Sequence, residues 1–477
     1  MSRMSIGRSM AWMGCMSLLG QIFTWGVTII VARLLTPEDY GLVGLSGLFT
    51  VFAQSVSEMG VGAAVIQRRE LSKSQIQSLY GFSLLVGGVM TFIGFLVAPL
   101  MAWVFTDDRL RPLVAFQSLI FLLTAAKSMQ RNLLVREARF DVIAKFETLA
   151  RVVTSVCTLV LAASGCGYWA LAAQWLFIEF FQLIFFCYLE RVVPTLRIRF
   201  SEIREVLMFG AGVMMRSIVS QLYALVDTAI LGKLATKEFL GAYTFSKQLT
   251  NMPFEKIVRI VNQVLYPHMA RNQDNLPVLR DWTLKSADLQ MLTIAPLYYL
   301  LFFCSDEVVN VLLGQNWEDA IFPMKILCIA SVFKLSESYN MNCLTALGKV
   351  SIQVRYMMLL LLSVGGGMLV TALIVDVKSS LLVWVTVYPV LSVMFSRVLL
   401  RSLGLGFLEI LKCVKSTLIA QVVMVIGLCV LSVYVYGDVW FTLMIKCIFG
   451  FAVYVATLAF IDRGKIVRYA RILIPAA

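Results

Sequence analysis

The sequence predicts an all-α protein that crosses the membrane many times. Hydrophobic residues make up 60% of the 477 residues and charged residues only 14%, whereas soluble domains are roughly half apolar and a quarter charged. The basic residues lie in short clusters between long apolar runs, and an early segment recurs later in the chain. These observations predict a polytopic bundle of about fourteen helices. We expect two six-helix lobes related by a parallel repeat, followed by two appended helices.

The apolar runs set the expected number of spans. A spanning helix needs about 20 mostly apolar residues, and fourteen stretches have that character. They are 10–32, 41–66, 78–105, 113–134, 146–164, 168–189, 207–230, 239–265, 283–304, 320–345, 354–375, 380–400, 413–435 and 439–461. The first is too long for a signal peptide, so we expect it to be retained. No interval between spans is long enough for a soluble domain, which places function within the bundle.

The positions of Lys and Arg predict the orientation. With a cytoplasmic N-terminus, 25 basic residues fall in cytoplasmic segments and 6 in the opposite loops. Because cytoplasmic loops are typically rich in Lys and Arg, both termini are expected in the cytoplasm. The net charge of +13 is therefore explained by the membrane, and no nucleic-acid partner is expected.

An internal repeat relates the two halves. Residues 9–50 align with residues 209–250 without a gap and share eleven identities. Six predicted spans separate the copies, and an even number keeps both in the same direction through the membrane. The repeat predicts an N-terminal lobe at 1–200 and a C-terminal lobe at 201–402, facing each other across a central cavity. Residues 403–477 hold the appended spans and the C-terminal segment.

Signals for enzymatic or metal chemistry are missing from the sequence. The ten cysteines lie almost all in apolar runs, and no metal-ligand spacing or phosphate-binding loop occurs. The single histidine, His268, follows Pro267 at a span end. We therefore expect no metal, no cofactor, no direct use of ATP and no catalytic residues.

Several motifs in order carry a resemblance to a known family. Residues 32–42, ARLLTPEDYGL, resemble the first outer loop of Wzx-type polysaccharide flippases, in the multidrug/oligosaccharidyl-lipid/polysaccharide superfamily. The second half of the chain also resembles this family, with matching residues at the family's spacing. The similarity is greatest to the colanic acid exporter branch. The matching residues of that half are Phe209, Gly210, Asp227, Gly232, Gly241, Tyr243, Pro253 and Pro267, with the runs 313–317 and 346–349.

The resemblance implies a function and a location. Its members move an undecaprenyl-diphosphate-linked oligosaccharide across the bacterial inner membrane by alternating access, for exopolysaccharide or lipopolysaccharide synthesis. The expected substrate is thus a lipid-linked oligosaccharide, carried by a monomer that works beside a polysaccharide polymerase and export machinery. The expected protein is an ion-coupled transporter and not an enzyme.

Basic residues inside the spans are candidates for substrate binding. An ionisable side chain in a span costs about 2.5–3.5 kcal/mol unless it faces a cavity or a partner. Ammonium and guanidinium groups around a cavity suit a diphosphate, and Arg can bind it through two hydrogen bonds. The candidates are Lys127, Arg131, Arg216, Lys247 and Lys334. The alternative is a lattice of intramembrane salt bridges; Glu147 with Arg151, four residues apart, is expected to be such a structural pair.

Acidic residues inside the spans are candidates for ion coupling. Asp227, Glu58 and Glu179 have no basic residue at helical spacing in their own spans, so each could take up and release an ion as the cavity changes sides. Asp227 stands where the first repeat has Val27. The coupling ion is H⁺ or Na⁺, and a cross-helix pair with one of the lysines is the alternative for each carboxylate.

Two other functions fit the sequence less well than flipping does. A drug exporter of the same superfamily would have a more apolar and acidic cavity, which the surplus of positive charge in the spans disfavours. An O-antigen polymerase or ligase would carry a large outer loop, and no predicted outer segment here exceeds about fifteen residues. Flipping of a lipid-linked oligosaccharide is therefore the expected function.

Overall fold

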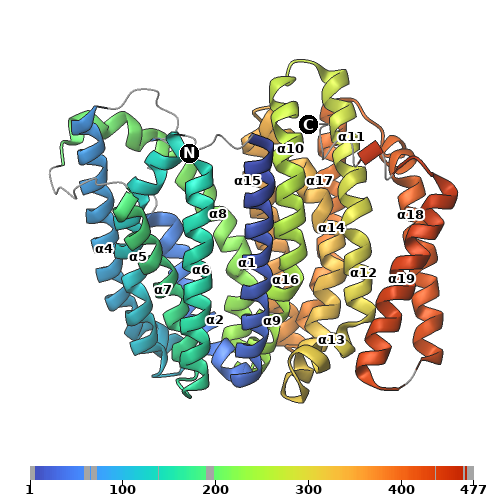
Figure 1. Ribbon diagram of the computed structural model, residues 1–477, viewed down its shortest axis with the longest axis horizontal. Helices are drawn as coiled ribbons and strands as arrows, with labels where there is room; N and C mark the ends of the chain where they lie inside the picture. The colour runs from blue at the N-terminus through green and yellow to red at the C-terminus, as the bar shows by residue number, and fades with distance from the viewer. Residues whose placement is uncertain are drawn as a thin grey trace. The chain divides into compact units, whose positions relative to one another are not determined.

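The computed structural model describes residues 6–57, 65, 72–137, 139–189, 198–435, 437–465 and 468–469. Every regular element in these ranges is a helix (Figure 1). The chain divides into two compact units, Met1–Gly241 and Ala242–Ala477. The lobe boundaries expected from the repeat, at residues 200 and 402, stay a prediction.

The first unit is built from long helices. Its members are α1 (Ile6–Leu34), α2 (Pro37–Ser57), α4 (Lys73–Phe105), α5 (Leu110–Arg136), α6 (Phe140–Ala163), α7 (Tyr168–Leu189) and α8 (Phe200–Leu234). A capping box starts α4: the Ser72 hydroxyl accepts from the Gln75 amide at 3.1 Å, and the Gln75 side chain accepts from the Ser72 amide at 3.0 Å. Helix α5 packs against α4, α2 and α7, and α1 packs against α6.

The second unit has more interrupted helices. It contains most of α9 (Lys237–Pro253), η1 (Phe254–Val258), α10 (Arg259–Arg271), α11 (Leu276–Thr293), α12 (Ala295–Phe303), α13 (Ser305–Leu312), η2 (Gln315–Ala320), α14 (Ile321–Ala346), α15 (Val350–Leu360), η3 (Leu361–Gly365), α16 (Gly366–Ile374), η4 (Ser379–Leu382), α17 (Val383–Leu403), α18 (Phe407–Tyr434) and α19 (Val439–Ile461). Pro253 precedes the π-helical turn η1, and Pro296 follows the break between α11 and α12. Proline accounts for both irregularities, because it lacks the amide hydrogen that a continuous helix needs.

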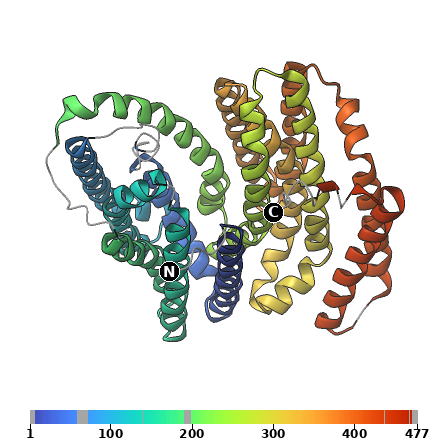
Figure 2. The same ribbon diagram turned by 45° about the horizontal axis from the view of Figure 1, so that its top comes forward.

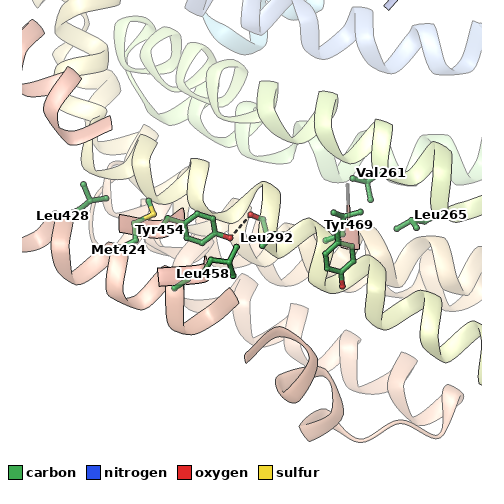
Figure 3. Packing of buried hydrophobic residues seen from close by; sticks show 10 residues of the cluster. Val261, Leu265, Leu292, Met424, Leu428, Tyr454, Leu458 and Tyr469 are labelled. Carbon is green, nitrogen blue, oxygen red and sulfur yellow. Dashed lines mark hydrogen bonds between the residues drawn. The ribbon is translucent and has the colours of Figure 1, made fainter. Parts of the chain in front are cut away.

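The appended helices pack onto this unit through a buried core. Helices α18 and α19 run side by side in both views (Figures 1 and 2). Residues of α10, α11, α18 and α19 meet in one cluster, shown in Figure 3. The Tyr454 hydroxyl donates to the Leu292 carbonyl at 2.8 Å. That carbonyl lies four residues before Pro296, which has no amide to donate, so the tyrosine satisfies a group that the helix break leaves open.

The two copies of the repeat meet at the first turns of α2 and α9. A Cβ added at Gly41 would overlap the carbonyl oxygen of Lys237, and one added at Gly241 would overlap that of Pro37. The repeat offset of 200 makes Gly41 equivalent to Gly241 and Pro37 equivalent to Lys237. The contact is therefore pseudo-symmetric: each copy places its glycine against the first helical residue of the other. Only glycine permits this approach, which explains why it recurs in the repeat.

The helices agree in position with the predicted spans. Thirteen of the fourteen predicted ranges fall on a single described helix or on consecutive helical segments, and the range 41–66 coincides with α2 up to Ser57, beyond which it lies mostly outside the described residues. By length and apolar character, nine helical stretches of the described chain could cross a membrane. The count of fourteen therefore stays a prediction. Helices α8 and α14, which carry Asp227, Lys334 and Glu337, are outside the nine.

Candidate functional site

The first unit holds Lys127 in a buried ion pair. Lys127 on α5 lies 2.6 Å from the Glu179 carboxylate on α7, and its ammonium also donates to the Gln182 side chain. The Thr124 hydroxyl, one turn earlier on α5, donates to the same Glu179 oxygen at 2.8 Å. The structure thus brings together one predicted substrate residue and one predicted coupling residue. This is the cross-helix pair that the sequence offered as the alternative for Glu179.

Arg131 lies one turn beyond Lys127 and belongs to a second cluster. Its Nε is 2.9 Å from Glu147 on α6, and a terminal nitrogen of Arg151 is 3.4 Å from the other oxygen of that carboxylate. The expected pair of Glu147 and Arg151 is confirmed, but Glu147 is shared. Two guanidinium groups therefore face one carboxylate, and both arginine side chains are partly exposed. From the sequence spacing, Arg151 was predicted only as the structural partner of Glu147.

Asp227 is buried in α8, as expected. Its Oδ1 accepts from the Thr228 amide at 2.6 Å and from the Thr228 hydroxyl at 3.1 Å. Thr228 is one of the identities of the repeat, with Thr28 in the first copy. Two other predicted residues cannot be placed: Glu58 and the side chain of Arg216 lie outside the described residues.

The second unit holds the other two predicted cations. Lys334 on α14 donates to the Asn251 side chain at 3.1 Å and lies 4.9 Å from the centre of the Phe254 ring. These partners flank Pro253 at the junction of α9 and η1, so the helix break positions them. The ammonium of Lys247 is 5.9 Å from the centre of the Tyr243 ring. Cations over aromatic rings are attracted to the face of the ring.

Glu337, three residues after Lys334 on α14, forms a hydrogen bond with another helix. Its Oε2 accepts from the Tyr388 hydroxyl on α17 at 2.7 Å. Tyr388 is 51 positions away, and nothing in the local sequence linked it to Glu337. The structure therefore adds Tyr388 to the polar groups inside this unit.

Other intramembrane charges have structural partners. Lys446 on α19 lies 2.5 Å from Glu307, and Lys325 lies 2.6 Å from Asp306. Asp288 on α11 lies 2.8 Å from Lys465. Each of these three charges therefore has an oppositely charged partner, which offsets the cost of placing it in or near a span.

A polar network at the repeat loops was not predicted. The guanidinium of Arg109 contacts Glu38 at 2.6 Å and Asp107 at 2.9 Å, and Lys237 also pairs with Asp107. Partial burial disfavours the charged carboxylate, but hydrogen bonds from Arg109 and Lys237 outweigh it and lower the pKa of Asp107 to about 2. Hydrogen bonds to Asp107 and Glu38 raise the pKa of Arg109. Asp107 therefore stays ionised near neutral pH and keeps its ion pairs with Arg109 and Lys237.

No group of His, Cys, Asp and Glu that could hold a metal occurs within the described ranges. The ring of His268 stacks on Trp282, with centroids 4.6 Å apart. The chemistry available at the described site residues is therefore ionic: ammonium and guanidinium groups paired with a few carboxylates.

Comparisons with known proteins identify what the chain is similar to. A family model described as polysaccharide biosynthesis protein matches residues 30–322. The teichuronic acid biosynthesis protein TuaB of Bacillus subtilis strain 168 is 25% identical over 341 residues, covering 68% of this chain and 67% of that protein. The lipopolysaccharide biosynthesis protein WzxC of Escherichia coli strain K12 is 25% identical over 333 residues, covering 69% and 67%.

A solved structure shows the same fold. The lipid II flippase MurJ in an inward closed conformation matches with a TM-score of 0.73 at 12% sequence identity, over 96% of this chain and 100% of that one. The expected all-α polytopic membrane architecture is confirmed by this likeness. The resemblance read from the loop and glycine motifs is confirmed by the match over residues 30–322.

Proposed function

Because the chain belongs to the family of polysaccharide biosynthesis proteins, we propose that it is a flippase for a lipid-linked oligosaccharide. The match over residues 30–322 carries this proposal. The protein is a multi-pass membrane transporter and not an enzyme. It moves an undecaprenyl-diphosphate-linked glycan across the bacterial inner membrane, with both termini in the cytoplasm, for exopolysaccharide or lipopolysaccharide synthesis.

The diphosphate of the substrate is bound by intramembrane cations. Those of the first unit are Lys127, Arg131 and Arg216, and those of the second are Lys247 and Lys334. The shared carboxylate of Glu147 supports a role for Arg131 in binding the diphosphate. Arg131 and Arg151 carry two positive charges, and the described carboxylate that they share carries one negative charge. An anionic phosphate satisfies such a surplus, and a guanidinium binds it through charge-assisted hydrogen bonds.

Lys127 differs from Arg131 because its charge is already balanced. Glu179 neutralises it in the described conformation. For Lys127 to bind phosphate, the Glu179 carboxylate must lose its charge or move away. Proton uptake at Glu179 would do this, which couples an ion to substrate binding within one pair. Asp227 and Glu58 are the other coupling candidates, and H⁺ or Na⁺ remains the coupling ion of this proposal.

The protein works as a monomer that hands its product to a polysaccharide polymerase and export machinery. The absence of a phosphate-binding loop in the sequence supports coupling to an ion gradient over direct use of ATP. Alternating access follows from the parallel repeat, since two related halves can rock about a fixed site.

Deletion of the gene in its host tests the proposal. Without the flippase, lipid-linked oligosaccharide should accumulate and surface polysaccharide should be lost. Spheroplasts treated with a membrane-impermeant lectin should then bind less of that glycan than wild-type spheroplasts. A deletion strain with normal surface polysaccharide and normal lectin binding would contradict the proposed function.

A further inference from the structure

A pocket with a strongly basic rim lies within the second unit, where the appended helices meet α11. Its volume is about 530 Å³. The lining residues come from α11, from the first half of α18 and from the end of α19 with the segment after it. Neither Lys247 nor Lys334 lines it. The pocket is therefore separate from the described cations of this unit that the proposed function uses.

The charges of the pocket do not cancel. Five cations line it against three carboxylates. Three of the cations are neutralised within the pocket: Lys285 by Asp281 at 2.6 Å, Lys465 by Asp288 at 2.8 Å and Arg468 by Asp462 at 2.6 Å.

Two lysines carry the remaining charge. Lys412 and Lys415 are exposed and form no hydrogen bond or ion pair with any other described residue. They lie three positions apart on α18, so they point to the same side of the helix. The pocket thus presents two adjacent ammonium groups whose counter-charge must come from outside the described part of the chain.

The floor of the pocket is a buried and hydrogen-bonded ion pair. Lys465 and Asp288 have side chains only 3% exposed, and Lys465 also donates to the hydroxyls of Ser416 and Thr417 at 2.9 and 2.8 Å. The Tyr469 hydroxyl donates to Asp288 at 2.7 Å. Figure 3 shows Tyr469 in the packed cluster with Val261 and Leu265. The charges of the floor are thus satisfied within the protein, which leaves Lys412 and Lys415 as the uncompensated charges of the pocket.

One wall of the pocket is apolar and continues along the helix. Ile419 follows Lys415 by one turn on the same side of α18, and Ile461 and Leu284 complete this wall. Beyond it, Phe460 on α19 has 86% of its surface exposed. In a membrane protein such exposed apolar surface faces lipid chains. The face of α18 therefore changes from charged to apolar within two turns, as a phospholipid does between headgroup and acyl chain.

We propose that this pocket binds the phosphate headgroup of an anionic glycerophospholipid, with its acyl chains against Ile419 and Ile461. Basic pockets between spanning helices are suited to anionic headgroups. The apolar wall favours a lipid over free phosphate, because a soluble anion gains nothing from it. The bound lipid holds α18 and α19 against α11, and this role does not depend on which glycan the protein moves.

Native mass spectrometry of the purified full-length chain tests the proposal. Phosphatidylglycerol, phosphatidylcholine and inorganic phosphate are titrated separately. We expect phosphatidylglycerol to bind at least ten-fold more tightly than either of the others. An interfacial lysine contributes about 1 kcal/mol to binding an anionic lipid, which is about a five-fold change in affinity. Lys412→Gln and Lys415→Gln should each weaken binding about five-fold, and the double variant about thirty-fold.

Matched variants keep the test decisive. The double variant Lys73→Gln/Lys349→Gln removes the same charge from two exposed lysines outside the pocket and should bind as the wild type does. Lys412→Arg/Lys415→Arg keeps the charge and should also bind. Equal affinity in the glutamine and control variants would overturn the proposal. So would inorganic phosphate that binds as tightly as phosphatidylglycerol, because the site would then recognise a soluble anion.

Discussion

Removing the charge of Lys127 separates its structural role from its proposed role in transport. The perturbation is Lys127→Met alone, Glu179→Leu alone, and both together. In the single variant Lys127→Met, Glu179 keeps its burial and loses its ammonium partner. In the double variant no uncompensated charge remains, so stability and transport can be measured independently of each other.

The structure gives the size of the expected effect. The side chains of Lys127 and Glu179 are 10% and 9% exposed and 2.6 Å apart, which makes this a buried pair. Removing one partner of such a pair costs about 3–5 kcal/mol. The Thr124 hydroxyl still donates to Glu179 and offsets about 1 kcal/mol. We expect Lys127→Met to lose about 2–4 kcal/mol, and the double variant to recover most of it because a buried pair can often be replaced by apolar residues at little cost.

The assay combines thermal melting in detergent with translocation of lipid-linked oligosaccharide in vesicles. A charge-assisted contact to phosphate is worth about 1.5–3 kcal/mol, so the double variant should fold well and transport about 10- to 100-fold more slowly. The matched control is Lys446→Met/Glu307→Leu, a pair with side chains 9% and 11% exposed that lies outside the proposed substrate set. The control should show the same recovery of stability and keep wild-type transport.

Two results would refute the reasoning. If Lys127→Met melts as the wild type does, the pair with Glu179 does not stabilise the protein. If the Lys127→Met/Glu179→Leu variant transports as fast as its control, Lys127 is structural only. Substrate binding would then have to be sought at Arg131 and the cations of the second unit.

Three further predictions concern the repeat contact, the loop network and coupling. Gly241→Ala should destabilise the protein by about 1–3 kcal/mol, because the new Cβ would overlap the Pro37 carbonyl. Gly47→Ala should not destabilise it, because no atom lies near the new Cβ. Thermal melting in detergent compares the two variants, and equal losses of stability would contradict the contact. The pKa of Asp107 is about 2, against an ordinary value of 3.8. The ion pairs of Asp107 therefore stabilise the protein fully above about pH 4, and this stabilisation is lost as the pH falls through about 2. Asp107→Asn should remove this fall of the melting temperature in acid, and an unchanged acid profile would contradict the role of Asp107. Asp227→Asn should insert normally but transport slowly and without a response to an imposed pH gradient, and a wild-type response would remove this residue from coupling.

The positions of the helices could be predicted from the sequence because local apolar character determines them. Even the range 239–265, which contains Pro253, is helical throughout, although it holds a π-helical turn at Phe254–Val258. Pro253 indicated an irregularity at this place, but its local sequence did not distinguish a π-helical turn from a kink or a helix end. Ion pairs between residues four positions apart in one helix, such as Glu147 and Arg151, could also be predicted because their contact is local.

Partners on different helices could not be predicted. Glu179 follows Lys127 by 52 positions and Lys465 follows Asp288 by 177, and nothing in their local sequence links them. The sequence indicated that each buried charge needs a partner but not which one. Lys237 and Asp107 lie 130 positions apart, and nothing in the local sequence of either indicated their ion pair.

Translocation by the purified protein tests the central claim most directly. The chain is reconstituted into vesicles that carry an undecaprenyl-diphosphate-linked oligosaccharide on both leaflets, and a membrane-impermeant glycan-modifying reagent is added outside. If the protein is a flippase, the reagent should modify nearly all of the glycan lipid in vesicles that contain the protein, and about half in protein-free vesicles, where only the outer leaflet is accessible. If modification stops at the protein-free level in both, the protein does not move this lipid and the proposed function is wrong.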